Sequence, residues 1–171
     1  MAAGTSLAAE AKAAAAMRRI KVFADLDQLQ LDSFLIYMEV IRVTKFSTIA
    51  LTGDHGDAMY LILVGEVRAY ILKNQHETTL SNIGVRDFFG EISLLDEGPR
   101  SASVMANEDS ILLKISAESF EQLVREAPAL AAPFLYALSR SVAGRIRNLT
   151  TRYLDSINFA RAAEALKAHA K

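Results

Sequence analysis

The feature that most constrains the fold of this chain is a succession of short β-branched and aromatic runs between about residues 40 and 115, each followed by turn residues. Runs of this length separated by Gly, Asn and Asp are typical of antiparallel strands. Strands are therefore expected at Ile41–Phe46, Met59–Val64, Val67–Leu72, Thr78–Ile83, Ala102–Ala106 and Ile111–Ile115. Their regular spacing predicts an antiparallel sandwich or roll.

Helical patterns flank the strand region on both sides. Residues 1–39 are rich in Ala at first and loosely amphipathic later, which predicts helix. After the strands, Ser116 is a suitable N-cap, and Pro128 and Pro133 predict a break and a restart. A long helix is expected from about Phe134 to Asp155 or further. The expected fold class is α+β: an antiparallel β-roll over about 40–115, flanked by N-terminal helices and a long C-terminal helix.

Composition excludes several kinds of protein. The 171 residues suit one domain, and a net charge of −1 argues against a nucleic-acid binder driven by bulk charge. The absence of cysteine excludes disulfides, thiolate zinc sites and Cys-ligated iron–sulfur clusters. The three histidines are far apart in sequence, so no metal site is expected. No apolar run reaches the length of a membrane span and no secretory signal is recognisable, which predicts a cytoplasmic protein.

The segment from Phe88 to Val104, FFGEISLLDEGPRSASV, carries the most chemical information. Its apolar piece, Ile92 to Leu95, predicts a short helix inside a loop, and the N–H groups at a helix start suit a phosphate. Arg100 follows Glu91 by nine positions, and an arginine can clamp a phosphate through two parallel hydrogen bonds. The alternative is that Glu91 caps the short helix and pairs with Arg100 on the surface.

The ordered run FGEISLL…GPRSASV resembles the phosphate-binding cassette of the cyclic nucleotide-binding domain family. That family includes kinase regulatory subunits, cyclic-nucleotide-gated channels and bacterial catabolite activators. Gly65, in LVGEV, matches a turn glycine of the family, and the resemblance covers roughly residues 20–155. The chain departs from the family at Arg86, where a glycine is usual.

The resemblance implies a ligand, cyclic AMP or less favourably cyclic GMP, and a role for each site residue. Glu91 would bind the ribose 2′-hydroxyl and Arg100 would neutralise the cyclic phosphate. The remaining cassette residues would complete the phosphate cradle. Three strand residues would form the wall of the pocket beside the base, although these three residues could equally be ordinary core residues. The cradle residues are Gly90, Ile92, Ser93, Ser101 and Ala102, and the wall residues are Val67, Ala69 and Leu80. No resident cofactor and no catalytic residue is expected.

The expected C-terminal helix carries an apolar stripe with spacings of 4, 4, 3, 4, 4 and 3 residues. Its members are Leu138, Val142, Ile146, Leu149, Tyr153, Ile157 and Ala160. Such a stripe can pack on the roll of its own chain or pair with a second subunit, and both alternatives stay open. Residues 134–171 also contain seven Lys or Arg against two Asp or Glu, which is more typical of a solvated helix face than of a partner site.

The sequence-based division of the chain has three parts: an Ala-rich helical extension (1–19), a nucleotide-binding domain (20–155, with C-terminal helices over 116–155) and a helical tail (156–171). The residues after Asp155 are too few for a helix-turn-helix module, so direct DNA binding is not expected. The expected function is a stand-alone receptor that signals through its C-terminal helix to an unidentified effector protein. The alternatives are a roll that no longer binds nucleotide and a metal-dependent enzyme, and the second lacks clustered ligands.

Overall fold

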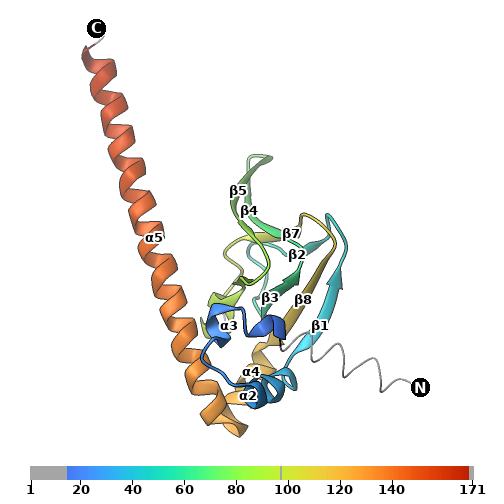
Figure 1. The fold of residues 1–171 in the computed structure, drawn as a ribbon. Coiled ribbons are helices and arrows are strands. Elements are labelled where there is room, and N and C mark those ends of the chain that lie inside the picture. Colours follow the sequence, from blue (N-terminus) through green and yellow to red (C-terminus); the bar gives the residue numbers. More distant parts are fainter. Residues whose placement is uncertain (1–14, 97, 170–171) are drawn as a thin grey trace. The chain divides into compact units, whose positions relative to one another are not determined.

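The computed structural model describes residues 15–96 and 98–169 (Figure 1). Its eight strands are β1 (Glu39–Val43), β2 (Thr48–Ala50), β3 (Ala58–Val64), β4 (Val67–Lys73), β5 (His76–Ile83), β6 (Phe88–Phe89), β7 (Ser103–Ala106) and β8 (Ser110–Ser116). Its helices beyond residues 15–17 are η1 (Lys21–Phe23), α2 (Gln28–Leu35), α3 (Glu91–Asp96), α4 (Ala117–Glu126) and α5 (Pro128–His169).

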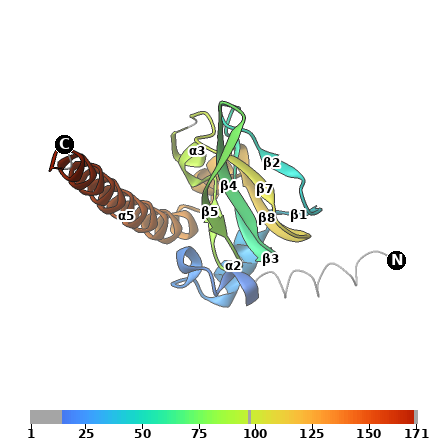
Figure 2. The same ribbon diagram turned by 90° about the horizontal axis from the view of Figure 1, so that it is seen from above.

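The strands form two four-stranded antiparallel sheets, in the orders β1-β8-β3-β6 and β2-β7-β4-β5. Figure 2, seen from above, shows the strands of the two sheets gathered around a common centre. One buried core joins both sheets, with Tyr60 and Leu112 from the first and Val67 and Val104 from the second. The expected α+β roll with flanking helices is therefore confirmed.

The first expected strand, Ile41–Phe46, is only partly correct. β1 ends at Val43, and Phe46 lies in a turn with φ of 66°, a conformation that interrupts a strand. The Phe46 N–H donates to the carbonyl of Ala106 at 2.8 Å, so the chain passes here from the first sheet to β2 in the second. Neither β2 nor the two-residue β6 was expected, since both are too short to give a period-two pattern.

The helical region expected over residues 1–39 consists of short separate helices where the structure describes it and ends before β1 begins at Glu39, and residues 1–14 of that prediction lie outside the described residues. The chain is helical at 15–17, turns, and enters α2 only after Asp27. The Asp27 carboxylate accepts from the Gln30 N–H, and the Gln30 side chain accepts from the Asp27 N–H. This capping box starts a new helix and explains why the first one does not continue.

Four phenylalanines tie the helices of the first unit together. Phe134 has ring-centroid distances of 5.1, 4.9 and 6.0 Å to Phe23, Phe34 and Phe120, and Phe23 meets Phe34 edge-on at 5.0 Å. Three of these rings have no exposed surface and Phe120 is also buried. Each such aromatic contact is worth about 0.5–1.5 kcal/mol beyond the area that it buries.

The helix expected to restart near Pro133 does not restart, because α5 runs without a break from Pro128 through Pro133 to His169. Pro128 occupies the first helical position, where a missing N–H has no consequence. Pro133 has no N–H to donate to the carbonyl four residues earlier, yet the helix continues through it. The expected N-cap of the preceding helix is confirmed, since the Ser116 hydroxyl accepts from the Ser119 N–H at 3.1 Å.

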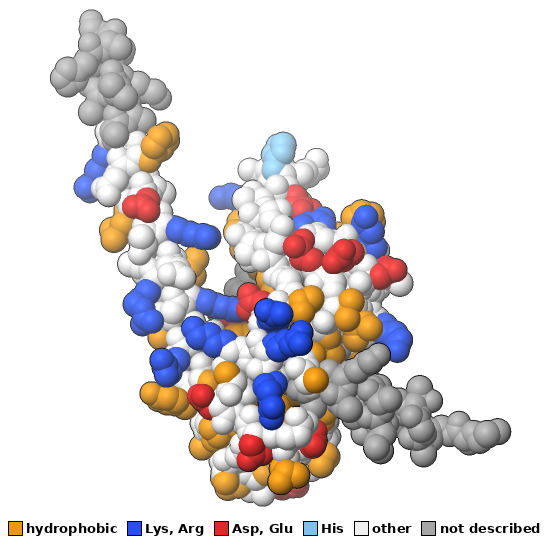
Figure 3. Space-filling model, viewed as in Figure 1, with side chains coloured by type: hydrophobic (Ala, Val, Ile, Leu, Met, Phe, Trp, Pro, Cys, Tyr) orange, Lys and Arg blue, Asp and Glu red, His pale blue; other side chains and the backbone are white. Residues whose placement is uncertain are grey.

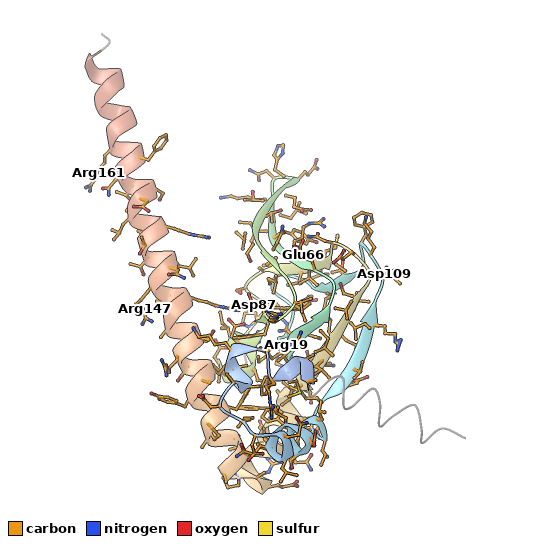
Figure 4. All side chains as sticks on the ribbon, in the orientation of Figure 1. Arg19, Glu66, Asp87, Asp109, Arg147 and Arg161 are labelled. Carbon is orange, nitrogen blue, oxygen red and sulfur yellow. The ribbon has the colours of Figure 1, made fainter. Side chains whose placement is uncertain are left out.

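The chain divides into two compact units, residues 1–134 and 135–171. The domain limits expected from the sequence at residues 19 and 155 differ from this division and stay predictions. In the second unit, Arg side chains lie among apolar ones along the described part of α5 (Figure 3), and Arg147 and Arg161 project from it (Figure 4). Within the described residues, no helix is both long and apolar enough to span a membrane.

Candidate functional site

The segment singled out in the sequence runs from β6 through α3 to the start of β7, and two of its charged side chains are buried. Glu91, the first residue of α3, is 5% exposed, and Arg100 is 7% exposed. Charged side chains are rarely buried to this extent unless they are paired or have a function. Neither side chain therefore lies on the surface, where the alternative interpretation placed an ion pair between them.

Gly90 brings the arginine to the start of α3. Its φ is +81°, and a Cβ built on it would lie 2.6 Å from Nη1 of Arg100 and 2.6 Å from the carbonyl oxygen of Ala58. The guanidinium therefore packs directly on the backbone that precedes Glu91, and only glycine leaves the space for it. The first hydrogen bond of α3 joins the Leu94 N–H to Gly90 O at 3.3 Å, so the N–H groups of residues 91–93 precede the helical ladder.

Two acceptors at the start of β3 hold the guanidinium of Arg100. Nη1 donates to the carbonyl of Ala58 at 2.7 Å, and Nη2 donates to Oδ1 of Asp57 at 3.3 Å. The Asp57 side chain is 59% exposed, so it is a loosely held counter-charge. A guanidinium has five N–H donors. The guanidinium can therefore bind a phosphate through N–H groups that Ala58 and Asp57 do not use, or the phosphate can replace Asp57 as an acceptor.

The five residues from Gly53 to Asp57, which we call the brace loop, also hold the main chain of the cassette. The Gly53 N–H donates to Arg100 O at 2.9 Å, and the Arg100 N–H donates to Asp54 O at 2.8 Å. Gly56 lies against Ser93 of α3, and a Cβ on it would also come within 2.9 Å of Gly98 O. The brace loop therefore contacts α3 and the loop that carries Arg100.

An aromatic pair lies beside the guanidinium. The rings of Tyr60 and Phe89 stack at 4.9 Å with an interplanar angle of 14°, and Cζ of Arg100 lies 5.7 Å from the centre of the Tyr60 ring. Burial raises the pKa of the Tyr60 hydroxyl; the charge of Arg100 opposes this, and the charges of Asp57 and Glu39 add to it. The phenol therefore stays neutral near pH 7.

The three expected wall residues lie in different surroundings. Val67 belongs to the core shared by the sheets, Ala69 packs partly buried against that core, and Leu80 is 48% exposed. Ala69 pairs with Ser81 and Tyr70 with Thr79, so Leu80 is the extra residue of a β-bulge. In the cassette, Ser93 is buried and Ala102 half-buried, while Ile92 and Ser101 are exposed.

Several residues of this site were missed by sequence reasoning. The brace loop was treated only as a turn, and Tyr60 and Phe89 only as strand or cassette residues. A signal was present in the loop itself, because Gly53 and Gly56 flank two residues directly before a predicted strand. Within the described residues, no group of three or more His, Asp or Glu side chains is placed to hold a metal ion.

The family model "Cyclic nucleotide-binding domain" matches residues 40–127. The Cyclic AMP receptor protein of Thermus thermophilus is 35% identical over 144 residues, 84% of this chain, and the cAMP-dependent protein kinase regulatory subunit of Aspergillus niger is 38% identical over 87 residues, 51% of this chain. The chain is also similar to a crystal structure of a cyclic nucleotide-binding domain from Methylobacillus flagellatus, with 27% identity and a TM-score of 0.76. The match covers 87% of this chain and 84% of the Methylobacillus chain.

The chain spans 64% of the length of the Thermus relative and 21% of that of the Aspergillus relative. The part shared with the kinase subunit is thus a single module of a longer protein. The family match covers just over half of the chain, from β1 to the end of α4, and contains the whole cassette and the brace loop. The chain belongs to the cyclic nucleotide-binding domain family.

Proposed function

We propose that this chain is a cyclic nucleotide receptor, without catalytic activity, whose ligand is cyclic AMP. The observation that carries the proposal is the burial of Glu91 and Arg100 at the two ends of one cassette, with the guanidinium packed on Gly90. A buried cation beside the start of α3 suits a cyclic phosphate, and a buried carboxylate one residue further suits a ribose hydroxyl. Burial of a charged group is costly, so two buried charges in one cassette favour a domain that binds a ligand over one that has lost it.

The preference for cyclic AMP over cyclic GMP rests on the two relatives reported above, both of which are named for cyclic AMP. Leu80 offers apolar surface to a purine of either kind, being half-exposed at the bulge of β5. Ser101 is exposed directly after Arg100 and can serve the phosphate or the amino group of guanine. The choice of nucleotide is therefore to be decided by measurement.

Isothermal titration of the ligand-stripped protein with cyclic AMP and then cyclic GMP tests the proposal. Binding at micromolar concentration or tighter, lost in Arg100→Ala, is the expected result. An absence of heat and of any thermal shift with both nucleotides would instead leave an interaction module that does not bind nucleotide, because a ligand of the native state must raise the apparent stability.

The proposed output is a protein contact made by α5. Ile146, Leu149 and Tyr153, members of the stripe expected from the sequence, are each between 58% and 66% exposed. A second copy of the chain is one partner for this stripe, and an effector protein is the other. Sedimentation equilibrium with and without cyclic AMP distinguishes them: a dimer abolished in Leu149→Lys supports pairing between copies, and a monomer under both conditions supports an effector.

DNA is the alternative output. We propose that the described residues do not bind it themselves, because the net charge of the chain is −1 and sequence-independent DNA binding depends on excess positive charge. Fluorescence anisotropy with a random-sequence duplex at about 150 mM salt, with and without cyclic AMP, should show no binding up to tens of micromolar protein. Salt-dependent binding in that range would contradict this part of the proposal.

A further inference from the structure

The guanidinium of Arg100 lies over the ring of Tyr60, at 5.7 Å from Cζ to the ring centre. We propose that Tyr60 is a positioning residue: its ring, stacked on Phe89, fixes the guanidinium of Arg100 in the place where the phosphate of the ligand meets it. The ligand part of this inference rests on the proposed function, whereas the positioning of the arginine can be tested without any ligand.

Arg100 needs an additional restraint because its two hydrogen bonds are not enough to fix a long side chain. Asp57 contacts Nη2 at a rather long 3.3 Å and is 59% exposed, so solvent screens the attraction between the two charges. The Arg100 side chain itself is only 6% exposed. A cation that has lost most of its water interacts more strongly with the face of an aromatic ring than an exposed one does.

The ring of Tyr60 is itself held firmly. Tyr60 lies inside β3 and is paired on one side with Lys114 of β8 and on the other with Phe89 of β6. Both stacked rings are almost fully buried, Tyr60 at 7% and Phe89 at 5% exposed. An aromatic side chain has only two rotatable bonds, so a ring packed in this way is a rigid surface for the guanidinium.

The pair also joins the two ends of the cassette. Phe89 directly precedes Gly90 and Glu91, and Arg100 lies at the far end beyond α3. Tyr60 stacks on Phe89, and the face of its ring lies under the guanidinium of Arg100. A shift of Tyr60 would therefore change the position of the arginine relative to Glu91, the two residues proposed to hold phosphate and ribose.

The first experiment is titration of four proteins with cyclic AMP. The ring, not the hydroxyl, carries the effect, so Tyr60→Phe should bind within about twofold of the wild type, whereas Tyr60→Leu should bind roughly three- to thirty-fold more weakly. Tyr70→Leu is the matched control, because Tyr70 is buried to a similar degree and Arg68 also lies 5.7 Å from its ring centre. Unchanged affinity in Tyr60→Leu, or an equal loss in Tyr60→Phe, would overturn the proposal.

The second experiment separates positioning from a general effect on the fold. If Tyr60 acts through Arg100, Tyr60→Leu should change the affinity by less than twofold in an Arg100→Ala background, measured by equilibrium dialysis at millimolar cyclic AMP. The same fold-loss in both backgrounds would mean that Tyr60 supports only the fold, which overturns the proposal. Should Tyr60→Leu not fold, Tyr60→Met supplies a second variant without a ring.

The third experiment needs no ligand and keeps the two proposals distinguishable. In a proton–nitrogen NMR spectrum of the unliganded protein, the Nε–H signal of Arg100 is assigned by its absence in Arg100→Ala. It should move in Tyr60→Leu, which removes the ring, and stay in place in Tyr60→Phe and Tyr70→Leu. A signal that does not move in Tyr60→Leu overturns the positioning of Arg100. Failure of the wild type to bind any cyclic nucleotide, with the NMR shifts as expected, would overturn only the proposed function.

Discussion

Arg100 and Asp57, 43 residues apart in sequence, meet at 3.3 Å in the candidate site, and the arginine is buried while the aspartate is exposed. The pair places a positive charge inside the protein with a counter-charge that solvent can also reach. A bound phosphate would supply a second negative charge to the same guanidinium.

Removal of the guanidinium should abolish most of the affinity for the ligand. Arg100→Ala is expected to weaken cyclic AMP binding tens to hundreds of fold, since a charge-assisted clamp is worth about 2–4 kcal/mol. Titration calorimetry measures the loss, and circular dichroism verifies the fold. The control is Arg125→Ala, which removes an exposed arginine paired with Glu121 one helical turn away and should leave the affinity unchanged. Equal binding by Arg100→Ala and the wild type would refute the site.

Glu91 should govern recognition of the ribose. The wild type is expected to bind 2′-deoxy cyclic AMP at least about tenfold more weakly than cyclic AMP, because a site built to bind a hydroxyl rejects the analogue without it. In Glu91→Ala, the two ligands should bind with nearly equal, weaker affinities. The readout is the ratio of the two dissociation constants, so a general loss of stability does not imitate the result. A ratio that is unchanged in Glu91→Ala would assign the ribose contact to another residue.

Gly90 should tolerate no side chain. Gly90→Ala places a Cβ 2.6 Å from both Ala58 O and Arg100 Nη1 at a φ of +81°, so the free energy of unfolding should fall by more than about 1 kcal/mol. Gly84 is the matched control, since a Cβ there meets nothing within 4 Å and its φ is not positive. Gly84→Ala should range from neutral to about 1 kcal/mol of stabilisation. Urea denaturation measures both, and equal effects would contradict the argument.

The raised pKa of Tyr60 should make the folded state sensitive to alkali. Burial keeps the phenol protonated above its ordinary pKa near 10, so the folded protein binds this proton more tightly than the unfolded chain does. The resulting stability is fully present below pH 10 and is lost as the pH rises through the folded-state pKa. Urea unfolding from pH 9 to 11.5 should therefore show a steeper decline for the wild type than for Tyr60→Phe. Parallel declines would mean that Tyr60 titrates normally.

The strands were predictable where they are long and regular, as in β3, β4 and β8. The apolar runs that form these strands are separated by turns that contain glycine or asparagine. Both signals are local in the sequence. The break between β1 and β2 was not predictable in this way. Phe46 has strong strand propensity, yet its N–H is bound by Ala106, sixty residues later, and this tertiary hydrogen bond overrides the propensity.

The residues of the candidate site were likewise only partly predictable from the sequence. Glu91 and Arg100 were found in the sequence because they lie in one short ordered motif. Asp57 and Tyr60 were not, because their relation to Arg100 exists only after β3 pairs with β6 and β8. Pro133 shows the opposite error, because proline usually breaks a helix interior and α5 nevertheless continues through it.

The brace loop has a consequence for how the site opens and closes. The main-chain N–H and carbonyl of Arg100 are hydrogen-bonded to Asp54 and Gly53, so both bonds end in this loop. Local opening of residues 53–57 would remove both of these hydrogen bonds and the Asp57 contact, and would leave the guanidinium held by Ala58 and Tyr60 of β3. The fraction of molecules with the loop closed then multiplies the intrinsic affinity. A mutation or temperature that loosens this loop would lower ligand affinity in a protein that still looks fully folded, and amide hydrogen exchange at Gly53 and Arg100 would report the loss directly.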